Sequence, residues 1–181
     1  MWRIEVDDEI VLRIPVIEDA ELLYELIDQN RENLRTWLDW VPETSSVEVT
    51  RGVIERWRRH ADQASDFQYV IEYRGSIVGA CGAMRLQGHQ NLAEIGYWLA
   101  EEMQGRGIIT RICTALLRWL FEDRNVNRVE IQVAAPNKKS RAVAERLGFT
   151  MEGYLRDTTL LDGQYFDTAM YSMLAREWAS S

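Results

Sequence analysis

Apolar residues in the first third of the chain recur at helical spacing after one short alternating stretch. The stretch IVLRIP predicts a strand, and three apolar-periodic segments after it predict three helices. Ser45 is followed three residues later by Glu48, a spacing that resembles the capping box at the start of a helix. We therefore expect a strand at 10–15 and three helices: one at 18–30, one that begins at Arg31 and ends before Pro42, and one from Ser45 to about Gln63.

From Phe67 the apolar period changes to two, which is typical of strands. Arg74-Gly75 supplies a turn between the first two of these strands, and Asp162-Gly163 joins the last two. A polar loop at 87–91 precedes a strand, a glycine-bearing loop, an amphipathic helix, a further strand and a helix that Gly148 ends. The expected strands lie at 67–73, 76–86, 92–99, 128–134, 149–161 and 164–174, and the expected helices at 108–122 and 137–147.

This order of elements predicts an α/β chain with a mixed, mostly antiparallel sheet of about seven strands. Antiparallel strands come first, a strand–helix–strand crossover makes a parallel pair, and a hairpin closes the chain, so helices are expected on both faces of the sheet. With 181 residues, 46% of them hydrophobic, and 3 prolines, the chain suits one folded domain over residues 1–181.

The chain carries 21 Lys+Arg against 29 Asp+Glu, a formal net charge of −8. This sign disfavours direct binding to nucleic acid or anionic lipid and favours a cationic partner. No apolar run approaches the roughly 20 residues of a membrane span, and the acidic start does not resemble a secretory signal, so we expect a cytoplasmic protein without membrane contact. Cys81 and Cys113 are too few for a disulfide framework or a zinc site, and each suits a buried position as a small hydrophobe.

The segment QGRGIIT at 104–110 lies at the start of a predicted helix, where backbone N–H groups point outward and suit a phosphate or pyrophosphate. It is not a Walker loop, because Gly107 is followed by Ile108 and Ile109 instead of Lys and Ser/Thr. It is not a dinucleotide fingerprint, because Thr110 stands where a third glycine is needed. On this spacing alone, a simple turn that begins a helix is the alternative.

Gln104, Gly107 and the strings around them resemble the GNAT superfamily of acyl-CoA-dependent N-acetyltransferases. Both residues match its Gln/Arg-x-x-Gly-x-Gly/Ala signature, whose last position here is Ile109. The strings IGYWL at 95–99 and QGRGIIT at 104–110 look like the branch of ribosomal-protein serine and alanine N-terminal acetyltransferases, in which a bulky residue at that last position is usual. The likeness continues through the segments at 137–140, 146–149 and 163–174, and it spans essentially the whole chain.

The resemblance implies the GNAT fold, in which the strands at 92–99 and 128–134 form a splayed parallel pair with acetyl-CoA between them. Backbone N–H groups of residues 105–108 would hold the pyrophosphate. Glycine is needed at 105 and 107 because a Cβ would obstruct close approach or forbid the required dihedral angles. The family likeness implies no metal. The residues expected to contact acetyl-CoA are Tyr97, Trp98, Leu99, Gln104, Gly105, Arg106, Gly107, Ile108, Thr110, Arg111, Asn137 and Ser140.

Acetyl transfer from a thioester to a neutral amine needs a proton acceptor, an oxyanion site and a group that assists the leaving thiolate. The resemblance assigns the oxyanion to backbone N–H groups at the end of the 92–99 strand. Many GNAT enzymes protonate the thiolate with a tyrosine at the position of Ala144, whereas Ser140 matches the serine proposed to assist the thiolate in the ribosomal-protein branch. Asn137 would contact the pantetheine arm. Both Asn137 and Ser140 are also suited to capping the following helix.

Glu101 matches the glutamate proposed as the general base in that branch, so we expect it to accept the amine proton, directly or through water. Its neighbour Glu102 is a second candidate, and Glu94, inside the preceding strand, is a third. The alternative for Glu101 and Glu102 is a solvated acidic turn that complements the dipole of the following helix.

The acceptor pocket of this superfamily is built by the early helices and the last hairpin, which here supply Trp37, Asp39, Trp40 and Tyr165. Two tryptophans and an aspartate within four residues suit a cationic amine. The same side chains equally suit core packing or the interface of a homodimer. His60 and His89 have no partner motif and are not candidates for a site.

The resemblance implies an acetyl-CoA-dependent N-acetyltransferase that acts by direct transfer in a ternary complex. Its branch favours a protein N-terminal α-amine, such as that of a ribosomal protein, as acceptor. Small amines, namely polyamines, aminoglycosides or amino acids, are the alternative acceptors. A second hypothesis is a non-catalytic acyl-CoA-binding sensor of the same fold, which the absence of the usual tyrosine at Ala144 supports. A third hypothesis is an unrelated protein that binds a nucleoside triphosphate.

Overall fold

A computed structural model describes residues 2–86 and 90–179 and contains one eight-stranded mixed sheet in the order β1-β2-β3-β4-β5-β6-β8-β7. Every neighbouring pair is antiparallel except β5 and β6, which are parallel. The strands are β1 (Arg3–Glu5), β2 (Ile10–Arg13), β3 (Phe67–Tyr73), β4 (Ser76–Met84), β5 (Leu92–Leu99), β6 (Arg128–Ala134), β7 (Thr150–Leu161) and β8 (Gln164–Leu174). The predicted kind of fold is confirmed.

The helices lie between these strands and at the C-terminal end. The α-helices are α1 (Ala20–Gln29), α2 (Arg31–Arg35), α3 (Val47–Asp62), α4 (Ile108–Arg118), α5 (Lys138–Arg146) and α6 (Ala175–Trp178). Short 3₁₀ turns are η1 (Ile17–Asp19), η2 (Val41–Glu43) and η3 (Glu101–Met103), and a π-helical turn, η4 (Trp119–Asp123), continues α4. Within the described ranges, no helix is long and apolar enough to cross a membrane.

The number of strands differs from the expectation. The sheet has eight strands instead of about seven, because Arg3–Glu5 pairs with β2 after a turn in which the Asp7 carboxylate accepts the N–H groups of Glu9 and Ile10. The polar loop expected at 87–91, with His89, has residues 87–89 outside the described part of the chain.

The second helix ends at Arg35 instead of continuing to the residue before Pro42. The Arg31 guanidinium donates to the carbonyls of Val41 and Thr44 at 2.9 and 2.8 Å, which folds the segment back on itself. The cap of α3 is Ser46, not Ser45: its backbone is extended and its Oγ accepts the Val49 N–H at 3.3 Å. The predicted cap is therefore wrong by one residue, because two serines stand next to each other at this helix start.

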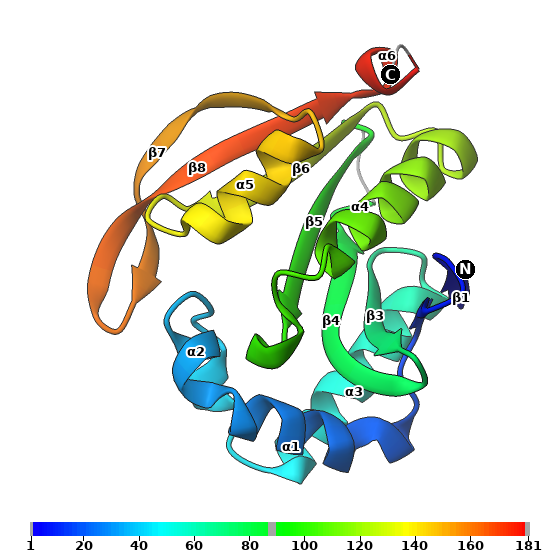
Figure 1. The fold of residues 1–181 in the computed structure, drawn as a ribbon, viewed down its shortest axis with the longest axis vertical. Helices are drawn as coiled ribbons and strands as arrows, with labels where there is room; N and C mark the ends of the chain where they lie inside the picture. The colour runs from blue at the N-terminus through cyan, green and yellow to red at the C-terminus, as the bar shows by residue number, and fades with distance from the viewer. Residues whose placement is uncertain (1, 87–89, 180–181) are drawn as a thin grey trace.

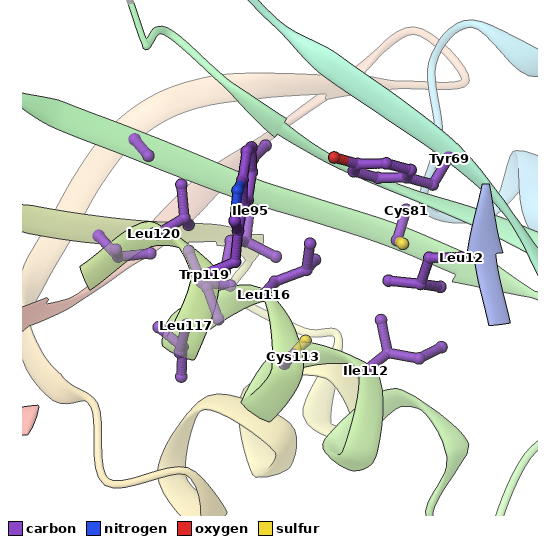
Figure 2. Packing of buried hydrophobic residues seen from close by; sticks show 14 of the residues in the cluster. Leu12, Tyr69, Cys81, Ile95, Ile112, Cys113, Leu116, Leu117, Trp119 and Leu120 are labelled. Carbon is purple, nitrogen blue, oxygen red and sulfur yellow. The ribbon is translucent and has the colours of Figure 1, made fainter. Parts of the chain in front are cut away.

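Helices cover both faces of the sheet, as expected (Figure 1). The alternation in β3 separates two buried clusters, since Tyr69 and Ile71 pack with α4 while Val70 packs with α1 and α3. Figure 2 shows Cys81 of β4 and Cys113 of α4 within the larger cluster. Both thiols are free and buried, and burial raises the pKa of Cys113 to about 12, so the reading as small hydrophobes is confirmed.

The parallel strands β5 and β6 pair only at their first residues and then separate. Their register joins Leu92–Glu94 to Arg128–Glu130, whereas β6 pairs with β8 along its whole length, from Arg128 to Ala134. The predicted bounds of both strands, 92–99 and 128–134, are confirmed. The separation leaves backbone groups and side chains of two central strands facing a gap in the middle of the sheet, and this gap positions the site.

Candidate active site

A cleft of about 1490 Å³ occupies the gap between β5 and β6. It is lined from both faces of the sheet: Ile95 belongs to the core cluster beneath α4, while Trp98 packs against the cluster of α1 and α3. The N-terminal ends of α4 and α5 form one side, and α2 with the residues just after it forms the other. All twelve residues expected to contact acetyl-CoA, from Tyr97 to Ser140, line this one cleft.

The glycine loop at the start of α4 has the backbone geometry that a phosphate site needs. Gly105 and Gly107 have φ of +74° and +72°, in the left-handed region that favours glycine. A Cβ at either position would meet nothing within 4 Å, so the dihedral angle, not crowding within the protein, requires glycine here. The Arg111 N–H donates to the Gly107 carbonyl at 3.1 Å and begins the helical ladder. The N–H groups before it are those that a helix leaves without intrahelical partners.

Side chains from other elements hold the loop in place. The Asn30 Oδ1, at the end of α1, accepts the Glu101 N–H at 2.8 Å. Gln104 accepts a hydrogen bond from Lys139 Nζ of α5 at 2.9 Å and donates to Asn33 Oδ1 of α2 at 3.4 Å. Gln104 thus connects the two sides of the cleft. The sequence did not predict the roles of Asn30 and Asn33, because each lies 71 positions from its partner and belongs to no motif.

The charge of the cleft is opposite to that of the chain. Among the described residues that line it, Glu101 is the one carboxylate, against five cationic side chains. Those side chains are Arg106, Arg111, Lys138, Lys139 and Arg146. Five cations and outward N–H groups suit a ligand with several phosphates, and the size suits one as large as a coenzyme A thioester. The described residues hold no cluster of His, Cys, Asp and Glu that could bind a metal ion.

Besides Lys139, which contacts Gln104, two more of these cations have protein partners. Arg111 Nη1 lies 2.9 Å from Asp7 Oδ2 and 3.0 Å from Glu9 Oε2, so the turn before β2 already satisfies part of its guanidinium. Arg146 Nη1 of α5 donates to the Thr110 Oγ1 of α4 at 3.1 Å. Arg146 was not among the predicted site residues. Its position in the last turn of a helix that begins at the cleft could have indicated it.

The N-terminal end of α5 carries a polar pair that faces the cleft. The Asn137 Oδ1 accepts the Ser140 N–H at 3.1 Å, so Asn137 is the N-cap of this helix. The Ser140 hydroxyl takes no part in that cap and lies 2.9 Å from the Tyr97 hydroxyl of β5. Burial raises the pKa of Tyr97, which keeps its phenol protonated. Ala144 is fully buried in α5.

A family model described as an acetyltransferase (GNAT) domain matches residues 9–150. The chain belongs to the GNAT acetyltransferase family. It is 40% identical to YdaF of Bacillus subtilis (strain 168), a protein provisionally named a ribosomal N-acetyltransferase, over 98% of each chain. The family resemblance drawn from the glycine loop is confirmed.

Two solved GNAT structures are similar over nearly the whole chain. RimL, a ribosomal L7/L12 α-N-protein acetyltransferase in complex with coenzyme A, has a TM-score of 0.92 and 28% identity, and the match covers 97% of this chain and 99% of RimL. The microcin C7 self-immunity acetyltransferase MccE, in complex with acetyl-CoA and AMP, has a TM-score of 0.90 and 33% identity, covering 94% and 95%. The chain is thus a GNAT N-acetyltransferase, and acetyl-CoA is its acyl donor.

The candidate bases differ in their access to the GNAT cleft. Glu101 lines it, whereas Glu102 is not among the lining residues, although both lie in the exposed turn η3. Glu94 accepts a hydrogen bond from Gln132, a lining residue of β6, at 3.3 Å, and Arg85 Nη1 lies 3.5 Å from it. Burial raises the pKa of Glu94 above its ordinary value despite Arg85. The geometry therefore places Glu101, and not Glu102, in the cleft.

The residues predicted for the acceptor are not brought together. Trp37 lines the main cleft, while Asp39 lines a separate cavity of about 350 Å³ next to Leu38, a residue that both cavities share. Trp40 packs against Trp98, with ring centroids 6.2 Å apart. Tyr165, on the last hairpin, is 60% exposed. Of the four, Trp37 is the one that the structure places at the GNAT cleft, and the role of all four in binding an acceptor stays a prediction.

Proposed function

We propose that this GNAT enzyme acetylates the N-terminal α-amine of a protein, with a ribosomal protein as the first candidate, by direct transfer between two substrates bound together. One observation carries the proposal: the same cleft is lined from both faces of the sheet, with its cationic side at α4 and α5 and its other side at Trp37 of the α2 segment. A donor with several phosphates suits the first side. The second side leaves an approach for an amine.

The names of the similar proteins favour this class of acceptor. RimL acts on the α-amine of ribosomal L7/L12, and YdaF is provisionally named for ribosomal acetylation. MccE was solved with acetyl-CoA together with a second, nucleotide ligand. An arrangement in which donor and acceptor sit side by side needs no covalent enzyme intermediate. This agrees with the position of Cys81 and Cys113, which are buried in the core and are not among the described residues that line the cleft.

Within this proposal the residues of the cleft have separate tasks. Glu101 accepts the proton that the amine must lose, because it is the carboxylate that lines the cleft in the described chain. Backbone N–H groups near the end of β5 stabilise the carbonyl oxygen as it gains negative charge. The loop of Gly105 and Gly107 binds the pyrophosphate, and Ser140 assists the departing sulfur. Asn137, as N-cap, fixes the turn that carries Ser140.

The test is release of free thiol from acetyl-CoA by the purified protein with separate amines: Ser- and Ala-starting peptides, ribosomal extract, spermidine, an aminoglycoside and an aminoacyl nucleotide. We expect turnover with the peptides or extract, and a mass increase of one acetyl group on the modified N-terminus. Glu101→Gln should lower kcat by about 10²-fold or more, while Glu102→Gln, its neighbour outside the cleft, should leave kcat within about twofold. Turnover confined to a small amine would overturn the proposed acceptor, and acetyl-CoA binding without turnover would favour the sensor.

A further inference from the structure

Tyr97 and Ser140 form a pair across the cleft that the family signature does not include. Tyr97 shares a face of β5 with Ile95 and Leu99, and its ring packs against the main core cluster. Its hydroxyl reaches the first turn of α5 and lies 2.9 Å from the Ser140 Oγ and 3.3 Å from the Ser140 carbonyl oxygen. Both residues line the cleft. The strand and the helix are thereby joined within the cleft.

The contacts of the Tyr97 hydroxyl allow two directions for this hydrogen bond. Ser140 lies in the first turn of α5, where a carbonyl accepts the N–H of the residue four positions later, here Ala144. The protonated phenol can donate its one proton to the Ser140 carbonyl oxygen at 3.3 Å or to the Ser140 Oγ at 2.9 Å, and in the second contact either hydroxyl can be the donor. We consider the arrangement in which Tyr97 donates through the shorter contact and the Ser140 hydroxyl accepts. The serine's own proton is then free to point away from Tyr97.

We propose that Tyr97 is a positioning residue that donates to the Ser140 hydroxyl and turns the serine proton toward the sulfur of the leaving thiol, so that the pair replaces the tyrosine absent at Ala144. The proposal rests on the proposed function, amine acetylation from acetyl-CoA. In the transfer, the amine nitrogen forms a bond to the thioester carbonyl carbon and loses a proton to Glu101. The carbon–sulfur bond breaks and its electron pair leaves with sulfur, which receives a hydrogen bond from Ser140.

The experiment compares Tyr97→Phe, Ser140→Ala and the double variant in steady-state kinetics with an accepted amine. Loss of one hydrogen bond that acts in the transition state should lower kcat of Tyr97→Phe by about tenfold, with the KM for acetyl-CoA unchanged. Ser140→Ala should lower kcat at least as much. The double variant should match Ser140→Ala within about twofold, because Tyr97 acts only through Ser140.

Tyr171→Phe is the matched control. The Tyr171 hydroxyl also contacts α5, accepting from Arg141 Nε at 3.0 Å and donating to Glu145 Oε1 at 2.8 Å, but it does not touch Ser140. Its removal should leave kcat within about twofold. Melting temperatures check the folds, and removal of one hydroxyl should shift each by no more than about 4 °C.

Three results would overturn the proposal. Tyr97→Phe with the wild-type kcat would remove the role of the hydroxyl. An equal loss from Tyr97→Phe in the wild-type and Ser140→Ala backgrounds would show that Tyr97 does not act through Ser140. A raised KM with unchanged kcat would make Tyr97 a contact for donor binding alone. Failure of the proposed function is distinguishable, since the wild-type protein would then release no thiol with any amine.

Discussion

Two glycines of this chain differ in backbone conformation, so alanine should lower the free energy of unfolding at one of them and raise it at the other. Gly107 has φ of +72° at the start of α4, where an L-residue is strained by about 1–2 kcal/mol. Gly52 lies inside α3, where a Cβ would meet nothing within 4 Å. Gly107→Ala should destabilise the fold by about 1 kcal/mol, and Gly52→Ala should stabilise it by about 0.5–1 kcal/mol.

Urea denaturation of the two variants measures both free energies of unfolding, and titration with CoA measures the phosphate site. Gly107→Ala should also weaken CoA binding, because relief of the strain moves the first N–H groups of α4. Gly52→Ala should leave CoA binding unchanged, since α3 contributes no residue to the cleft. A Gly107→Ala variant as stable as the wild type would contradict the strain argument.

Sequence alone could predict those site residues that lie within one continuous signal. Gln104, Gly105 and Gly107 follow a strand and open a helix, so their place at the cleft follows from local structure. The hydrogen bond between Tyr97 and Ser140 joins positions 43 apart. Spacing along the chain does not indicate which tyrosine of a strand contacts which turn of a distant helix. Asp39 failed to join Trp37 for a related reason, because the turn between α2 and η2 sends adjacent side chains to different cavities.

At the scale of elements, the polar side of β6, β7 and β8 makes the fold sensitive to acid. The Glu152 carboxylate of β7 accepts two hydrogen bonds from Arg128 of β6, both 2.7 Å, and one from Ser172 of β8 at 2.6 Å. Arg128 first, and Ser172 second, lower the pKa of Glu152 to about 2 from an ordinary value of 4.5. Glu152 therefore stabilises the three strands while it is ionised.

The sign of the pH dependence follows from this lowered pKa. The contribution of Glu152 is fully present above about pH 4.5 and is lost as the pH falls toward 2. The melting temperature of Glu152→Gln should therefore lie below that of the wild type at pH 6, and the gap should close steadily below pH 4.5. Thermal unfolding across that range measures the gap. A gap that stays constant with pH would mean that ionisation of Glu152 contributes nothing to folding.

Elements with an unbroken period could be predicted to the residue, and those set by distant contacts could not. The bounds of β5 and β6 follow from apolar alternation between clear turn signals. The strand β1 has three residues and one buried side chain, Ile4, which is too short a pattern to distinguish from an acidic tail. The end of α2 depends on the contacts of Arg31 with carbonyls 10 and 13 residues away, which no local propensity encodes.

At the scale of the whole molecule, a net charge of −8 coexists with a cleft of five cations and one carboxylate. The mean charge of the protein therefore repels a polyanionic donor at long range, while the cleft attracts it at short range. Salt screens the exposed part of both interactions over about 10 Å at 0.1 M. The dissociation constant for CoA can show whether the net charge or the charge of the cleft has the larger effect.

Two arginine variants separate these interactions, because each changes the net charge of the chain by the same amount. Arg146 lines the cleft beside Thr110, whereas Arg118, at the end of α4, is exposed and is not among the lining residues. Arg146→Gln should raise the dissociation constant for CoA about twofold to fivefold at low salt, and this ratio should shrink as salt is added. Arg118→Gln should leave the dissociation constant unchanged. Equal weakening by both variants in calorimetric titrations would mean that net charge governs donor binding, and the cationic lining would then have no local part in it.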